Sequence, residues 1–188
     1  MKRRSMIAMS ATLALVAGYL AISPALKAKG DLRANREHAS GLMSQAKAQA
    51  FALQQDVNLL MVNYTQSEAG LNDGQIAAIR QHISDAEGLY ADLNNVAADA
   101  EPWQRDVIGQ IAPLLKELAG NTTSALGFID NRDTWLHETE FAEYMAANAR
   151  FSKQEATVVE STVNLGHARN GFDDAYGRFL NALMAGLG

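Results

Sequence analysis

The sequence predicts an all-α protein, an up-down-up-down antiparallel four-helix bundle with a long fourth helix. Apolar residues recur at helical heptad spacing in four successive segments of the chain. The connections between these segments are short, and helices of this kind pack against antiparallel neighbours at about 20°. The 188 residues have the length of one domain and include no cysteine, so packing rather than disulfides must hold the bundle together.

The N-terminal segment has the layout of a secretory signal peptide. Basic residues at positions 2 to 4 precede an apolar run over 6–22, which is followed by Ser23, Pro24 and Ala25. We expect a signal peptide over 1–25, with cleavage possibly as late as residue 28, and a bundle over 31–188. The alternative is an uncleaved anchor, because an apolar run of about 17 residues is only slightly short of a membrane span. Both interpretations predict an exported protein, either periplasmic or secreted after cleavage or anchored by the retained helix.

The first predicted helix covers 32–64 and the second begins after Asn72. Gln75 follows Asn72 by three residues, an approximate capping box that predicts a helix start. The second helix should end before Pro102. Each helix has two heptad positions that we expect to face the core. In the first helix they hold Leu32, Ala39, Ala46, Leu53 and Leu60, and Met43, Ala50, Val57 and Tyr64. In the second they hold Ile76, Ile83, Tyr90 and Ala97, and Ile79, Ala86 and Leu93.

The third predicted helix begins at Pro102, because proline suits the first helical turn. Pro113 lies in its interior and predicts a kink, since proline removes a hydrogen bond and crowds the preceding turn. The expected core row consists of Ile108, Leu115 and Ile129 with Ile111, Leu118 and Ala125, and Thr122 is its polar exception.

The fourth predicted helix begins near Thr139 and continues to about residue 185. Its expected core row repeats every seven residues at Tyr144, Phe151, Val158, Leu165, Phe172 and Phe179. A break at Asn170 and Gly171 is the alternative. An unbroken helix would outrun the bundle. Its tail should then bury an apolar stripe against the segment around Leu32, a second copy of the chain or a membrane surface, through Phe172, Tyr176, Phe179 and Leu183.

One segment of the third helix resembles a known type of protein. It contains Pro102-Trp103-Gln104, then the run 113–119, then Asn121-Thr122-Thr123. This segment resembles exported helical-bundle proteins of bacteria. The resemblance implies the fold and the export, and it implies no activity.

Composition and motifs argue against several kinds of chemistry. The chain has 21 acidic and 16 basic residues, a balance that disfavours nucleic acid as a partner. The four histidines, at positions 38, 82, 137 and 167, fall on different elements and are interpreted as surface residues. His137 and Glu138 begin like a zincin motif, but Phe141 stands where the second histidine would have to be. We therefore expect no metal and no cofactor.

Polar residues on or beside the predicted seams are the remaining candidates for a site. They are Arg36, Thr122, Asn148, Glu155, Thr162 and Arg169. Buried polar groups cost free energy unless they are paired, so these residues either fix the helix register or form a site. Arg36 and Arg169 should lie at the same end of the bundle, near Asp99 and Glu101. They form either an ion network or an anion pocket.

The leading functional hypothesis is a noncatalytic exported bundle that acts by binding a protein or the cell envelope. The chain shows no nucleophile-and-base pattern and no phosphate-binding or dinucleotide-binding loop, so we predict that it is not an enzyme. The alternative is a periplasmic bundle that binds a small ligand, an anion or a noncovalent b-type haem. Met43 and His167 are the candidate haem ligands.

Overall fold

The computed structural model describes residues 24–66, 71–130 and 138–185, and these residues form a four-helix bundle. The helices are α1 (Pro24–Gln66), α2 (Asp73–Ala97), α3 (Pro102–Asp130) and α4 (Glu138–Ala185). The predicted fold class is therefore confirmed, as are the start of the fourth helix and its unbroken course to residue 185. The apolar run over 6–22 lies outside the described residues. Both predicted cleavage positions, after Ala25 and after Ala28, fall inside α1.

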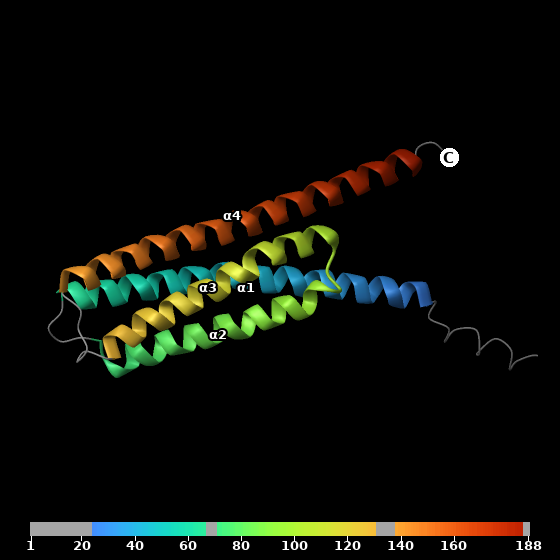
Figure 1. Cartoon of the computed structure of the whole chain (residues 1–188). Helices are drawn as coiled ribbons and strands as arrows, with labels where there is room; N and C mark the ends of the chain where they lie inside the picture. The colour runs from blue at the N-terminus through green and yellow to red at the C-terminus, as the bar shows by residue number, and fades with distance from the viewer. Residues whose placement is uncertain (1–23, 67–70, 131–137, 186–188) are drawn as a thin grey trace, which may run out of the picture.

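The helices are arranged as an inner pair with one helix on each side. α1 and α3 each contact the other three helices, whereas α2 and α4 lie on opposite sides of that pair (Figure 1). Most of the residues predicted to face the core in the first three helices are buried, including Met43, Leu53, Ile79 and Ile111. Leu32 is 64% exposed, so its predicted place in the core is wrong. Because α4 packs mainly onto the α1–α3 pair, one of its sides remains open.

Two local features predicted from the sequence are seen in α2 and α3. The Asn72 side chain accepts a hydrogen bond from the Gln75 amide at 2.9 Å, and the Gln75 side chain accepts one from the Asn72 amide at 3.0 Å. This is the predicted capping box, which satisfies N–H groups that the first helical turn leaves free. In α3 the helix continues through Pro113, which lies on the exposed side.

The row of α4 that we predicted to face the core is exposed, so that prediction is wrong. The buried face instead contains Phe141, Met145, Asn148, Ala149, Ser152, Glu155, Ala156, Val159, Val163 and Gly166. Most of these side chains are small, so α4 can approach the α1–α3 pair closely. The larger residues of the heptad row then point away from the core.

α4 leaves the bundle beyond Gly166. A Cβ atom at Gly166 would lie 2.9 Å from Cζ3 of Trp103, so the helix backbone packs directly on the indole ring of α3. None of the side chains described after Gly166 is buried. The tail of α4 extends past the start of α3 as an isolated helix (Figure 1).

Candidate functional site

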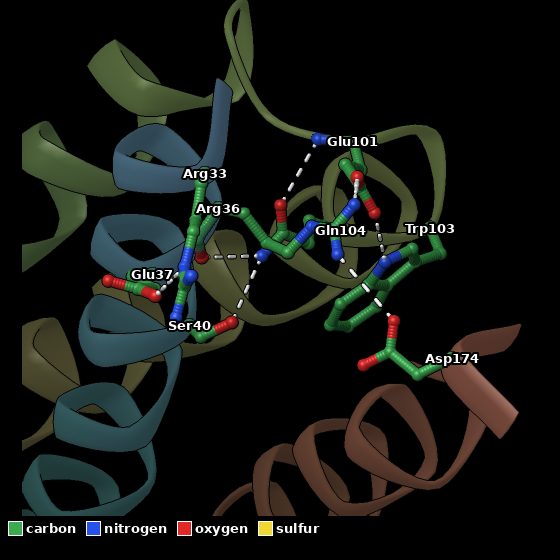
Figure 2. A network of polar contacts seen from close by, with 8 residues as sticks. All are labelled: Arg33, Arg36, Glu37, Ser40, Glu101, Trp103, Gln104 and Asp174. Atoms are coloured by element: carbon green, nitrogen blue, oxygen red, sulfur yellow. Dashed lines mark hydrogen bonds and ion pairs between the residues drawn. The ribbon is translucent and has the colours of Figure 1, made fainter. Parts of the chain in front are cut away.

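Arg36 lies at the centre of a polar network at the end of the bundle where α3 begins (Figure 2). Its guanidinium forms an ion pair with Glu101, and it lies 3.7 Å from Asp174 of α4. The other oxygen of Glu101 accepts a hydrogen bond from the Trp103 indole N–H at 3.0 Å. The network therefore connects α1, the start of α3 and the tail of α4.

Gln104 ties the start of α3 to α1. Its fully buried amide donates hydrogen bonds to the Arg36 carbonyl oxygen at 2.9 Å and to Ser40 Oγ at 3.0 Å. Its side-chain oxygen accepts a hydrogen bond from the Glu101 amide at 3.1 Å. A buried amide whose donors and acceptor are all hydrogen-bonded costs little free energy. It fixes the position of one helix against another.

A cleft of about 560 Å³ opens beside this network. It is lined by Arg33, Arg36, Glu37, Ser40, Asn170 and Asp174. Arg33 pairs with Glu37 at 2.8 Å, and Arg36 pairs with carboxylates as described above. The positive charge of the lining is therefore balanced, which favours the ion network over an anion pocket.

Arg169 does not join Arg36 in this cleft. Its guanidinium points to Asp106 of α3 at 4.0 Å, and both side chains are more than half exposed. An exposed pair at that distance contributes little to stability. The two arginines singled out in the sequence thus pair with different carboxylates and form no shared site.

The histidines do not converge. His38 and His167 are exposed, and His137 lies outside the described residues. His82, expected on the surface, is half-buried and lies 2.8 Å from the buried Asp56. Burial raises the pKa of Asp56, and the hydrogen bond from His82 opposes that shift. Across 24–66, 71–130 and 138–185, no three metal-binding side chains come together.

The two candidate haem ligands differ in burial, because Met43 is fully buried in the core whereas His167 is exposed. The second described cleft lies between α1 and α2, away from both residues. It is lined by Gln45, Ala48, Gln49, Ser84, Asp85, Gly88, Leu89 and Asp92. Neither cleft places these two residues across a common cavity.

A buried polar layer lies between α3 and α4. Asn148 donates a hydrogen bond to the Asn121 carbonyl oxygen at 3.2 Å, and Ser152 and Glu155 follow along the same face of α4. Burial and the nearby charge of Glu117 raise the pKa of Glu155 to about 8. Of the other polar seam residues, Thr122 is buried and hydrogen-bonds the Leu118 carbonyl within its own helix at 2.8 Å, and Thr162 is half-buried.

Within the described residues, α4 carries a row of large apolar side chains that are exposed. The α4 stripe, as we call it, consists of Tyr144, Phe151, Val158, Leu165, Phe172 and Phe179. These side chains are between 41% and 70% exposed. The positions three residues further along are also exposed and mostly small, namely Ala147, Gln154, Ser161, Ala168, Ala175 and Ala182.

The two ends of the α4 stripe differ in their surroundings. At the start of α4, the Tyr144 ring lies 5.0 Å from the ring of Phe128 on α3, measured between centroids. In the tail, Phe172 stacks on Tyr176 at 6.4 Å, and both rings are more than half exposed. Leu183, the last residue of the predicted tail stripe, is one whose side chain lies outside the described residues.

Two further findings complete the description of the chain. In the described residues, the helices are either too short or too polar to cross a membrane. No protein-family model matches the sequence, and comparison with curated proteins and with solved structures finds no match.

Proposed function

We propose that this protein is an exported, noncatalytic assembly protein that binds a helical partner protein through the α4 stripe. The observation that carries the proposal is the exposure of a row of large apolar side chains from Tyr144 to Phe179 of a 48-residue helix. Contiguous apolar patches beyond a few hundred Å² are uncommon on monomeric proteins and mark interaction sites.

The spacing of the α4 stripe supports a helix as the partner. Its residues recur every seven positions from Tyr144 to Phe179. A strict seven-residue repeat keeps one face of a helix turned toward another helix in a left-handed coiled coil. A flat or irregular partner surface would not require that period.

Charge favours a protein over an anionic membrane surface as the partner. Helices that lie on membranes carry lysine and arginine on their polar face. The chain has a formal net charge of −5, and Asp173 and Asp174 lie within the tail of α4. Export is supported by the basic residues and apolar run at the N-terminus.

The test is site-specific photocrosslinking in the cells that make the protein. A photoreactive residue in place of Leu165 or Phe151 should give a protein adduct of discrete mass. The same residue in place of Val62, an exposed position on α1, is the matched control and should give none. The absence of a protein adduct from both stripe positions, or lipid adducts alone, would overturn the proposal.

A further inference from the structure

The α4 stripe is complementary to itself. A surface that binds an unrelated partner would not need this property. Large side chains at one position of the heptad alternate with mostly small ones three residues further on. In an antiparallel pair of helices, most of the large side chains then face a small one of the other helix, and Leu165 faces the polar Gln154. Layers that alternate large and small residues interdigitate well.

We propose that the partner of the α4 stripe is a second copy of this chain, whose α4 packs antiparallel to the first. This inference rests on the proposed function and names the partner. The facing pairs are Tyr144 with Ala175, Phe151 with Ala168, Val158 with Ser161, Leu165 with Gln154 and Phe172 with Ala147, each from opposite copies. Phe179 lies at the edge of the pair, opposite Glu140.

Charges beside the stripe favour this register over one of the two registers shifted by a single heptad. Glu143 and Arg178 are both exposed and occupy the same flanking position of the heptad, each one residue before a stripe residue. In the register given above they lie beside each other across the dimer, twice by symmetry. In the register shifted by one heptad, Arg150 of one copy would lie beside Arg178 of the other, and like charges across a helix pair are unfavourable.

The antiparallel arrangement also covers the tail of α4. In this register the tail of one copy runs along the first turns of α4 in the other copy, whose outer face is open. The isolated tail and the open face of α4 thereby cover each other.

The area is sufficient for a stable dimer. Exposed fractions of the stripe residues correspond to roughly 600 Å² per copy, taking about 200 Å² for an aromatic side chain and somewhat less for valine and leucine. Both copies together exceed about 1,000 Å², the lower bound for a specific interface. A parallel pair would instead face Phe172 with Phe172 and leave alanine opposite alanine.

The first test is the oligomeric state of the protein purified as the cells process it. Sedimentation over 1 to about 100 µM should show a dimer, spanning the usual affinities for interfaces of this size. Leu165→Glu should shift the apparent Kd at least about 100-fold, because two charges would enter the interface. Val62→Glu is the matched control and should dimerise like the wild type. A wild-type monomer throughout, or a dimer unaffected by Leu165→Glu, overturns the proposal.

The second test gives the orientation and uses the absence of cysteine from the chain. Ala147→Cys and Phe172→Cys should form a disulfide with each other when the two proteins are mixed and oxidised mildly. Neither should form one alone, because disulfides need Cβ atoms about 4 Å apart. A disulfide in Phe172→Cys alone, as parallel helices would give, or none in the mixture overturns the antiparallel pair.

These results separate the two proposals. A monomer in vitro, with photocrosslinked adducts at Leu165 that contain a different protein, removes the second copy as partner and leaves the docking role intact. The absence of any protein adduct at the stripe removes both proposals. Adducts of two copies of the chain support both.

Discussion

Glu155 is an ionisable group in a place that disfavours its charge. The residue is 4% exposed, and both carboxylate oxygens are buried between α3 and α4. Burial, followed by the charge of Glu117, raises its pKa from 4.5 to about 8. The buried Asp56 has its pKa raised by burial too, but His82 hydrogen-bonds to it. Glu155 is therefore the residue whose protonation should be coupled to folding most strongly at neutral pH.

The stability of the bundle should fall as the pH rises from about 5 to about 9. The pKa of Glu155 is higher in the folded than in the unfolded state, so the folded protein holds an extra proton between these values. The stability this proton provides is fully present below pH 4.5 and is lost as the pH rises through about 8. Thermal unfolding of the wild type should show a Tm that decreases by several degrees over this range.

Glu155→Gln should remove most of that pH dependence and raise the Tm above that of the wild type at pH 9, since glutamine carries no charge to bury. The matched control is Glu87→Gln on the exposed face of α2, which should retain the wild-type profile. A wild-type Tm that stays constant from pH 5 to pH 9 would show that Glu155 reaches solvent when it ionises.

At the scale of the element, α4 has one side that is buried against the bundle and another side that is exposed. The face that packs on α1 and α3 includes small side chains along with Phe141 and Met145, and an exposed side of the helix carries the α4 stripe. At Gly166 the α4 backbone lies directly against Trp103 and Val107. The large indole ring of α3 thus occupies space that a side chain on α4 would need, and α4 diverges from the bundle just beyond this point.

Gly166→Ala should destabilise the protein by about 1 to 3 kcal/mol, the usual cost of overpacking a core. The added Cβ would lie 2.9 Å from Trp103 Cζ3 and 3.0 Å from Val107 Cγ2, and a buried indole cannot move aside freely. Gly171→Ala is the control, because its Cβ would meet no atom within 4 Å. It should stabilise α4 by up to about 1 kcal/mol. Urea unfolding measures both, and equal effects of the two substitutions would contradict the close packing.

At the scale of the whole molecule, the burial that stabilises the fold is confined to one part of the described chain. The core lies among α1, α2, α3 and the first half of α4, and the network around Arg36 fixes the end of the bundle. The tail of α4 contributes the ion pair between Asp174 and Arg36 but buries no described side chain. A segment with so little burial contributes little to folding and is free to serve association.

Deletion of residues 172–188 should leave the free energy of unfolding of the monomer within about 1 kcal/mol of the wild type. The ion pair that is lost, between Arg36 and Asp174, is half-exposed, and such pairs contribute no more than that. The same deletion should abolish dimerisation, since it removes Ala175 and Phe172, which face Tyr144 and Ala147 of the second copy. Urea unfolding and sedimentation measure the two effects. A loss of several kcal/mol would mean instead that the tail caps the bundle.

The sequence by itself determined the number of helices, several of their boundaries and the core of the first three. Each of those helices has a single apolar face, so the period of its apolar residues indicates which face is buried. The capping box at Asn72 and the continuity of α4 through Gly171 were also predictable, because both depend on local chemistry. Of the six polar residues placed on or beside the seams, Thr122, Asn148 and Glu155 are buried, Arg36 and Thr162 are half-buried, and Arg169 is exposed.

Only the tertiary structure decided which face of α4 is buried and which partners the arginines have. α4 carries two rows at the same period, one of large and one of mostly small residues, and periodicity alone does not rank them. The choice depends on how closely α4 approaches the α1–α3 pair, which Trp103 and Gly166 set from different helices. The pairing of Arg36 with Glu101 likewise joins residues 65 positions apart. Such contacts arise from the packing of whole helices, which no local pattern in the chain encodes.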